Sequence, residues 1–539
     1  MTRRRWRQLL MIAALGWGAP ACATQTPPAA PPSALIPARL RRLSNVEYER
    51  SANRLLGLDE PLRDELPPDE RQDGYAINER QAVPSYFASE LARVAERLAA
   101  RAVSERLPSL LPCPAGAPST SPCVERALAR LAFSAFRRPP NSVERSALLS
   151  LFQRGARTPP AATTDARSEG LRVVLATLLS SPDMLYLSEL GDDESRTDGV
   201  TTLAPYEIAS SLAYAVTGAP PDAELLALAA RPRPLLDGEV RARQARRLLS
   251  LSSTRHHFRQ FVLEWLEVDQ LERTAKAVSL VPNYDDVKSH MLAETSAFVD
   301  EVMVYGGASL ASLLAARFTS PDATMAAYYG IPGFAGPRVS LVRQGRVGVF
   351  QHASFLSAHA HEDVTSPIKR GDFVLRRVLC VDLPRPGELG IDTTLPPRDE
   401  RATTRGRFAA HTSSASCRSC HDRLDPLGFS FEGFDAAGRC RTREHEQPIV
   451  TNGELRLGGR ELSFRDSAEL ATELSELPEA RSCFAKQALR YLTGRRAPEM
   501  ERWFAELVEA LPSDRRESLL EWVVAWVKSP EFVLRRQAS

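Results

Sequence analysis

The stretch Cys417-Arg418-Ser419-Cys420-His421 determines how the rest of this sequence is interpreted. Two cysteines that are separated by two residues and followed at once by a histidine are typical of covalent haem attachment. Each thiol bonds one vinyl group of the porphyrin, and the imidazole then becomes the proximal ligand of the iron. We therefore predict one covalent haem c on Cys417 and Cys420, with His421 as the iron ligand.

Two other interpretations of the motif stay open. Cys417 and Cys420 could form a disulfide with each other, or they could supply half of a zinc site with His421 beside them. A tetrahedral zinc site normally needs a second pair of Cys or His ligands at similar spacing. Cys440 and His445 are the nearest candidates, and they do not repeat the spacing.

The segment that follows the motif, Asp425-Pro426-Leu427-Gly428-Phe429, is expected to support the haem. A carbonyl just before or at a Pro-Leu turn would accept the remaining ring N–H of His421 and fix its tautomer. We expect Pro426 and Phe429 to line the pocket. The carboxylates in and after this segment are expected to cap turns or to pair with arginine rather than to act as acid and base.

The sixth iron ligand is less clearly indicated. The first methionine after the motif is Met500, in another predicted domain, so His411 and His361 are the candidate distal ligands, and an open five-coordinate iron is the alternative. Lys369 and Arg370 are candidates for pairing with a haem propionate, unless they only begin an exposed helix.

Three other histidines are expected to be surface residues. His256 and His257 adjoin Arg255 on a polar helix face, which predicts that both are solvated. His290 stands four residues before Glu294, and this spacing predicts a surface pair on one helix.

Composition indicates a globular chain of several domains. The 539 residues exceed what one hydrophobic core normally organises, and the 43% hydrophobic and 25% charged content is ordinary. A net charge of +2 argues against nucleic acid as a partner. No G-x-S-x-G, H-E-x-x-H or P-loop pattern occurs, so hydrolase and nucleotide-binding functions have no motif to support them.

The first 23 residues are typical of an export signal. Arginines at positions 3, 4, 5 and 7 precede the short apolar run 9–15, and small residues surround Cys22. Cys22 could be the lipidated first residue of a lipoprotein, or a type I peptidase could cut near Ala21 or Ala23. No later segment reaches eighteen apolar residues, so no transmembrane helix is expected in the mature chain. We expect an exported protein of the periplasm, outer membrane or cell surface, with a possible lipid anchor.

Cysteine use fits an oxidising compartment. Cys113 and Cys123 flank a loop rich in Pro, Ser and Gly, where a local disulfide is predicted. One further pair among Cys380, Cys440 and Cys483 is plausible, and the sequence does not choose it.

Apolar periodicity predicts a mainly α multidomain protein. Ser44-Asn45-Val46-Glu47 and Asn141-Ser142-Val143-Glu144 are capping boxes, and the helices that they open are expected to stop at Gly57 and Gly155. Strand-like alternation is confined mainly to 448–464, where Asn452-Gly453 and Gly458-Gly459 are typical of hairpin turns.

Taken together, these stretches resemble a known family, the planctomycete cytochrome c domain proteins that are assembled with several planctomycete surface domains. The resemblance rests on the motif and the following residues to Arg439, and on the segments Arg41–Tyr48, Ala135–Pro139, Leu203–Ala209, Trp265-Leu266, Thr365–Gly371, Cys483, Gln487, Arg490-Tyr491 and Gly494-Arg495. It implies a haem domain among exported helical domains. Cys440 departs from the pattern, because an aromatic residue is expected there.

The resemblance and the composition predict seven segments: a signal peptide (1–23), a Pro/Ala linker (24–37), an N-terminal surface domain (38–80), a small helical domain (81–158), a central helical surface domain (165–335), a cytochrome c-like haem domain (340–445) and a C-terminal helical domain (446–539).

Three functions follow as hypotheses. The first is a monohaem protein that passes electrons to a redox protein partner in the cell envelope. The second is a haem enzyme with an open axial site, acting on peroxide or an organic substrate. The third is a non-haem binding or scaffold protein of the envelope.

Overall fold

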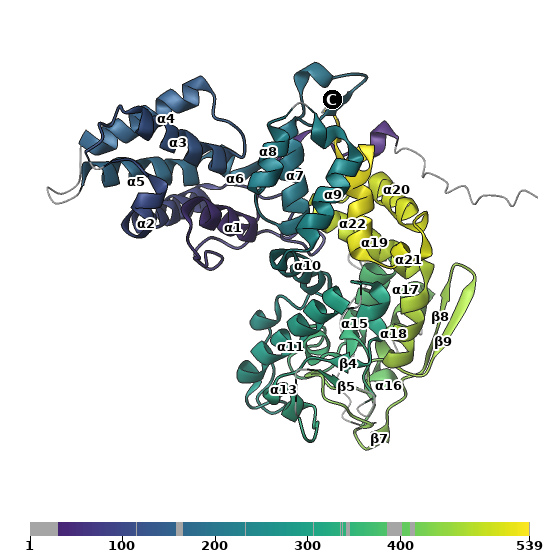
Figure 1. Ribbon diagram of the computed structural model, residues 1–539. Helices are drawn as coiled ribbons and strands as arrows, with labels where there is room; N and C mark the ends of the chain where they lie inside the picture. The colour runs from purple at the N-terminus through teal and green to yellow at the C-terminus, as the bar shows by residue number, and fades with distance from the viewer. Residues whose placement is uncertain are drawn as a thin grey trace, which may run out of the picture.

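The computed structural model describes residues 31–114, 116–157, 165–231, 233–305, 307–334, 336, 338–340, 345–384, 401–409 and 415–537. Over these ranges the chain is mainly helical and its strands form small two-stranded sheets, which confirms the predicted fold class. An N-terminal lobe of helices is set off from a larger body that holds the rest of the chain (Figure 1).

The N-terminal lobe is built from six helices: α1 (Asn45–Leu56), α2 (Ser85–Leu110), α3 (Pro122–Phe136), α4 (Ser142–Arg157), α5 (Ala166–Leu179) and α6 (Pro182–Leu185). Both predicted capping boxes are present, since Ser44 pairs with Glu47 and Asn141 with Glu144. One apolar core runs through the lobe from Leu43 to Leu187.

Gly155 does not end its helix as expected. α4 continues to Arg157, and a Cβ at position 155 would lie 3.0 Å from the Cα of Gly170 on α5. Gly170 is equally tight, because its Cβ would lie 2.7 Å from the carbonyl oxygen of Phe152. The glycines therefore allow two helices to pack closely, a tertiary requirement that looks like a stop signal in the sequence.

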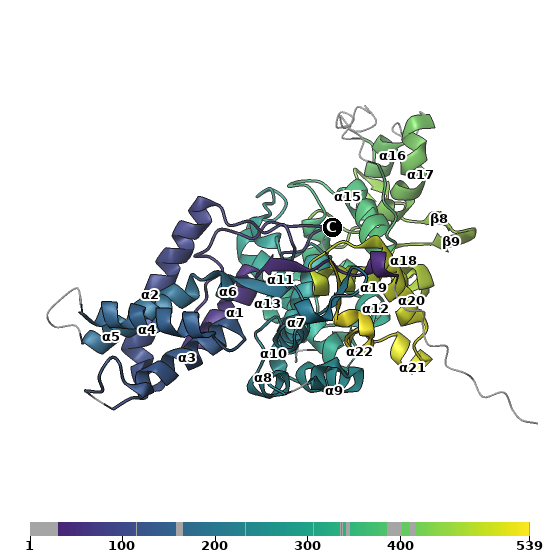
Figure 2. The same cartoon turned by 90° about the horizontal axis from the view of Figure 1, so that it is seen from above.

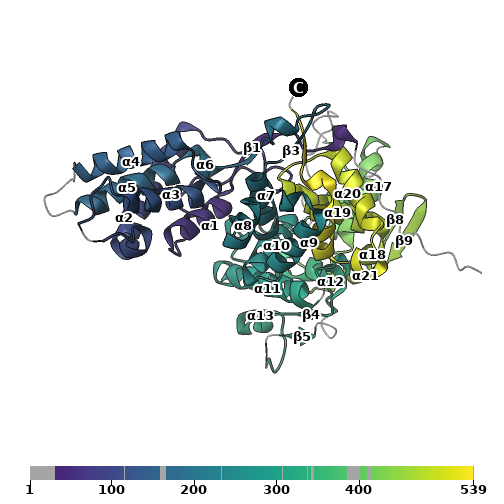
Figure 3. The same ribbon diagram turned by 45° about the horizontal axis from the view of Figure 1, so that its top comes forward.

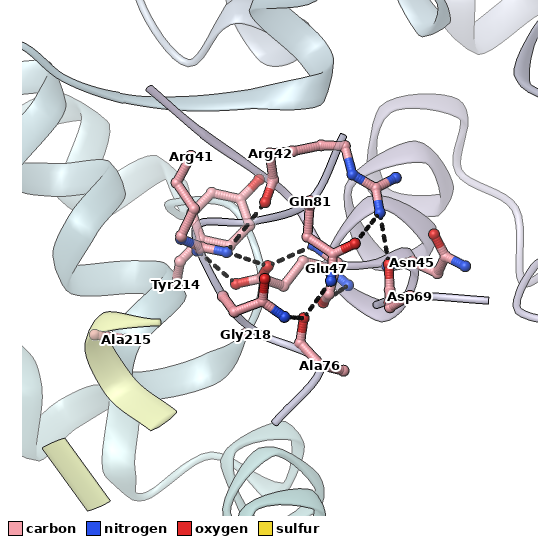
Figure 4. Close-up of polar contacts among 12 residues, drawn as sticks. Arg41, Arg42, Asn45, Glu47, Asp69, Ala76, Gln81, Tyr214, Ala215 and Gly218 are labelled. Atoms are coloured by element: carbon pink, nitrogen blue, oxygen red, sulfur yellow. Dashed lines mark hydrogen bonds and ion pairs between the residues drawn. The ribbon is translucent and has the colours of Figure 1, made fainter. Parts of the chain in front are cut away.

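Buried ion pairs hold the start of the lobe (Figure 4). Arg41 makes two hydrogen bonds of 2.8 Å to Glu47, and Arg42 donates to Asp69 and Gln81. Burial raises the pKa of Asp69 to about 6, against the effect of Arg42. Because removing one member of a buried pair leaves an uncompensated charge, these contacts fix the path of the chain into α1.

Short strands lie where the two lobes meet (Figure 3). β1 (Arg39–Arg42) pairs with β2 (Tyr186–Glu189), and β3 (Val200–Thr202) pairs with β10 (Leu534–Arg536). Glu189 links these strands, 2.8 Å from Arg39 and 2.5 Å from Arg535. Burial alone would raise the pKa of Glu189, but the charges of Arg535 and Arg39 hold this pKa well below its usual range. The C-terminal strand therefore closes against the beginning of the folded chain.

The larger body has one extended core that runs from Leu203 to Val533 and also includes Tyr75 and Ile77. Its helices are α7 (Pro205–Thr217), α8 (Ala223–Ala229), α9 (Gly238–Leu249), α10 (Ser252–Trp265), α11 (Tyr284–Tyr305), α12 (Leu310–Ala315), α13 (Ala323–Tyr328), α14 (Ala353–Ala358), α15 (Pro367–Phe373), α16 (Thr404–Phe408), α17 (Ala415–Phe429), α18 (Ser467–Glu476), α19 (Pro478–Thr493), α20 (Pro498–Glu509), α21 (Ser513–Arg516) and α22 (Leu519–Lys528).

Shorter elements complete the body and the junction. A π-helical turn, η7 (Val374–Val378), follows α15 directly. The remaining strand pairs are β4 (Phe318–Thr319) with β5 (Val339–Ser340), β6 (Arg443–Glu444) with β7 (Gln447–Pro448), and β8 (Gly453–Leu457) with β9 (Arg460–Phe464). Single 3₁₀ turns lie at Pro32–Ala34, Asp193–Ser195, Pro234–Leu236, Leu271–Arg273, Val349–Gln351 and Pro530–Phe532.

The predicted hairpin is β8–β9, which turns at Gly458-Gly459 with φ of 55° and 86°. Asn452-Gly453 is not a second hairpin turn. Gly453 begins β8 opposite Phe464, and a Cβ there would lie 2.6 Å from the Phe464 ring. The glycine is thus needed for the approach of an aromatic ring.

Two disulfides are present in the described part of the chain. The predicted Cys113–Cys123 bond is confirmed, and Cys380 pairs with Cys483. The second bond joins the end of η7 to α19 across 103 residues, whereas Cys440 is an exposed thiol. Among the described helices none has both the length and the apolar content to span a bilayer. The predicted signal segment with Cys22 lies outside the described residues.

Candidate haem-binding site

The motif occupies the first turns of α17, a helix that projects with α16 from the body (Figure 2). Cys417, Cys420 and His421 are spaced i, i+3 and i+4, so they share one face of the helix. All three are half-buried, and Cys417 and Cys420 are both present as thiols. A thiol pair and an imidazole on one accessible face is the donor set that covalent haem attachment requires.

Asp425 is the partner of His421. Its Oδ1 lies 2.7 Å from Nδ1 of His421, and its side chain is only 7% exposed. An ionised carboxylate can only accept, so Nδ1 carries the proton and Nε2 is the nitrogen suited to a metal. The hydrogen bond from His421 to Asp425 raises the pKa of His421, although burial acts in the opposite direction.

This contact corrects the expected hydrogen-bond partner of His421. A backbone carbonyl at a Pro-Leu turn was expected to accept from His421, but α17 continues through Pro426 to Phe429 and forms no turn there. On a continuous helix the residue four positions after His421 lies on the same face. The side chain of Asp425 therefore takes the role expected of a carbonyl.

The second half of α17 is packed against the body. A Cβ at Gly428 would lie 2.0 Å from the carbonyl oxygen of Pro367, and one at Gly371 would lie 2.3 Å from that of Leu424. α15 and α17 thus cross in backbone contact, which only glycine permits. Leu427 is fully buried in the same interface. The packing fixes the direction in which the motif face points.

Arg370 has partners inside the protein. Its guanidinium is fully buried and donates to the carbonyl oxygens of Leu356, Phe431 and Asp435. The structure thus gives Arg370 a role in joining α15 to the segment after α17, in contrast to the expected propionate contact. Lys369 is exposed, with its Nζ 3.5 Å from the carbonyl oxygen of Ala360, and its propionate contact stays a prediction.

The structure describes some of the remaining predicted pocket residues and candidate distal ligands, but not all of them. Phe429 is buried, with its ring 6.5 Å from that of Phe408 and the guanidinium of Arg405 5.1 Å above it. Pro426 is half-buried on α17. His361 is half-buried, and its carbonyl accepts from Lys276 at 2.6 Å. His411 lies outside the described residues, so both distal-ligand assignments stay predictions.

Two of the three surface histidine assignments need correction. His257 is buried, 3.2 Å from the carbonyl oxygen of Ala215 and packed on Tyr491. Burial lowers its pKa to about 3. His290 does pair on the surface, but with Asp322 instead of Glu294. The local spacing was misleading because tertiary neighbours supplied the partners.

Glu294 belongs to a buried polar network that the sequence did not indicate. It accepts from Thr319 at 2.5 Å and from Tyr329 at 2.7 Å, and Thr319 also contacts His352. Burial raises the pKa of Glu294 to about 7 and lowers that of His352 to about 3. The residues of this network come from four separate segments of the chain, so no local sequence pattern predicts it.

The other carboxylates after the motif behave as expected. Asp435 pairs with Arg439 at 2.8 Å, and Glu432 pairs with Arg441 at 2.6 Å. Over the described residues no group of three or more His, Cys, Asp or Glu side chains is arranged to hold a metal ion. The motif face of α17 fits haem by its donors, with two thiols and a histidine whose tautomer is set by a buried carboxylate.

Comparison with known families identifies the domains along the chain, including the one that carries the motif. Four family models match in order along the chain, each described as a protein of unknown function: PSD3 (DUF1587) over residues 41–104, PSD5 (DUF1595) over 123–189, PSD4 (DUF1592) over 203–331 and PSCyt3 (DUF1588) over 346–444. The last match contains the whole motif and Asp425. No curated protein and no solved structure matches the chain. The order and identity of the four domains place this chain in the family of planctomycete cytochrome c and surface domain proteins.

Proposed function

We propose that this chain is an exported c-type monohaem protein that carries single electrons between partners in the cell envelope. The observation that carries the proposal is the common, half-exposed face of Cys417, Cys420 and His421 on α17. Cys417 and Cys420 would hold the haem covalently and His421 would be the proximal ligand, while the haem supplies a one-electron couple. A helix that projects from the body would place this couple within reach of a protein partner.

The proposed compartment is supported by the disulfides. Cys113–Cys123 and Cys380–Cys483 are both bonds that persist in oxidising compartments. Covalent haem attachment also takes place after export, when the motif is still accessible. The export signal and lipidation at Cys22 remain part of this proposal, and a redox protein of the envelope is its proposed partner.

The proposal is tested by haem staining after denaturing electrophoresis. The full chain is expressed in a host with haem-maturation machinery, and covalent haem should survive SDS and give peroxidase activity at the position of the protein. Cys417→Ala with Cys420→Ala removes both thioethers and should abolish the stain. A control, Cys440→Ala, changes an exposed thiol outside the motif and should stain like the wild type. An unstained wild-type band would contradict the proposal.

A haem enzyme with an open axial site is the second candidate, and one contact favours it. The carboxylate of Asp425 makes His421 a stronger electron donor than a carbonyl would, which suits oxidised iron. Met500 is buried on α20 in another part of the body, so it is poorly placed as a sixth ligand. Cyanide titration of the ferric protein separates the candidates, because an open site binds cyanide readily and a six-coordinate carrier does not.

A further inference from the structure

We infer that Asp425 is a positioning residue that holds His421 in one orientation and lowers the reduction potential of the haem bound there. This inference rests on the proposed function, and it concerns residues whose contacts the structure describes. It assigns a specific task to a side chain that the sequence indicated only as a turn cap or an arginine partner.

The first step is the hydrogen bond itself. Nδ1 of His421 and Oδ1 of Asp425 are 2.7 Å apart, within the range of a charge-assisted bond. The two residues are one helical turn apart on α17, so the backbone keeps the contact without help from a loop. The close crossing of α15 at Gly428 also fixes the helix just beyond Asp425. The orientation of the imidazole is therefore set before any haem arrives.

The second step is burial. The Asp425 side chain is 7% exposed and that of His421 is 20% exposed, so water competes weakly for the bond. A hydrogen bond to a carboxylate in such surroundings is stronger than one to a neutral carbonyl. It shifts electron density onto the imidazole and makes it a more basic ligand. A more basic axial ligand stabilises ferric over ferrous iron, which lowers the potential.

The third step is the charge that faces Asp425. Arg405 on α16 lies over the Phe429 ring and donates to the carbonyl oxygens of Val450 and Asn452. Burial lowers the pKa of Arg405, and the nearby charge of Asp425 acts against that change. Arg405 thus places a positive charge on the neighbouring helix, near the carboxylate that accepts from His421.

The test compares two neutralising substitutions on one helix. Asp425→Asn replaces the carboxylate acceptor with a weaker amide, whereas Asp422→Asn removes an exposed negative charge that acts on His421 only through space. Both variants and the wild type are prepared as full-length haem proteins. Spectroelectrochemistry then gives the midpoint potential, and electron paramagnetic resonance of the ferric state reports the donor strength of the imidazole.

Asp425→Asn should raise the midpoint potential clearly more than Asp422→Asn and should change the ferric g-values, which Asp422→Asn should leave as in the wild type. Equal shifts in the two variants would reduce the effect to net charge and overturn the inference. If Asp425→Asn does not fold, Asp425→Glu carries the test, because it keeps the charge and displaces the acceptor by one methylene. Its potential should rise partway, and a wild-type potential would then overturn the inference.

The proposed function and the role of Asp425 are contradicted by different results. A wild-type protein without covalent haem contradicts the proposed function, and no potential is measured. A loaded wild type whose potential does not respond to Asp425 contradicts only the role of this residue and leaves the haem assignment intact.

Discussion

The two halves of α17 differ in almost every physical respect. The first half, from Cys417 to Arg423, is half-buried or exposed and carries all three residues of the haem motif. The second half, from Leu424 to Phe429, is largely buried and meets α15 in backbone contact at Gly428. The first half carries the cysteine and histidine side chains of the motif, and the packing of the second half fixes the direction in which they point.

The difference shows how a helix at the edge of the larger body can hold the motif side chains in place through its packed half. Asp425 lies where the halves meet, with a buried carboxylate that reaches back one turn to His421. A rigid second half therefore sets both the direction of the motif face and the orientation of its imidazole. Apart from Asp425, changes in the packed half should therefore affect the stability of the protein, whereas changes in the exposed half should affect ligation.

The largest expected effect comes from the disulfide that ends the segment packed on α17. Cys380→Ser with Cys483→Ser opens a link across 103 residues, whereas Cys123→Ser with Cys113→Ser opens one across 10. Loop-closure entropy predicts a loss of about 4–5 kcal/mol for the first pair and about 2–3 kcal/mol for the second. Urea unfolding measures both, and a larger loss for the short loop would contradict this ranking.

A smaller loss is expected when the contact between α15 and α17 is blocked. Gly428→Ala places a Cβ 2.0 Å from the carbonyl oxygen of Pro367, so the helices must separate, at a cost of about 3 kcal/mol. Gly406→Ala on α16 is the matched control, because its Cβ meets nothing closer than 3.4 Å. That control should be neutral or slightly stabilising. Thermal unfolding with equal losses in both variants would show that the crossing is not tight.

Burial and hydrogen bonding should also give different pH dependence in the body and in the motif half. Glu264, in the core of the body, has a pKa raised to about 7 by burial. Between about pH 4.5 and 7 the folded state then binds more protons than the unfolded state, so stability falls as pH rises through this window. Glu264→Gln should remove a loss on the order of 2–3 kcal/mol. Unfolding curves of both proteins between pH 4 and 8 measure the difference, and parallel curves would contradict the buried, raised pKa.

The smallest effect is expected in the exposed half. In haem-free protein with Cys417→Ser and Cys420→Ser, the Asp425 bond should keep the pKa of His421 above its usual value. A raised pKa contributes stability that is complete below about pH 6.5 and is lost as pH rises through the folded pKa. Histidine ring resonances followed by NMR should show this shift, and Asp425→Asn should reduce it. A pKa at or below the usual value would contradict the contact.

The features that sequence predicted well are local. The two capping boxes, the Gly458-Gly459 turn and the Cys113–Cys123 bond each depend on residues within about ten positions of one another, so their spacing carries the geometry. The mainly helical fold class follows from apolar periodicity in the same way.

The features that it missed depend on distant partners. Gly155 was expected to stop a helix, but it permits contact with Gly170, and His257 was expected in water, but it packs on Tyr491. The pairing of Cys380 with Cys483 could not be chosen from spacing across 103 residues. The contact of Asp425 lies between these two cases. Its position four residues after His421 predicts a contact, but only if the helix is known to continue through Pro426.

The central claim is that both motif cysteines bond one haem above His421, and the pyridine haemochrome spectrum tests it most directly. The position of the α-band reports how many vinyl groups have been converted to thioethers. We predict the two-thioether spectrum with one haem per chain for protein matured in a competent periplasm, and a one-thioether spectrum for any haem that Cys417→Ala retains. A wild-type protein that yields no haemochrome, or one with both vinyl groups intact, would contradict the account.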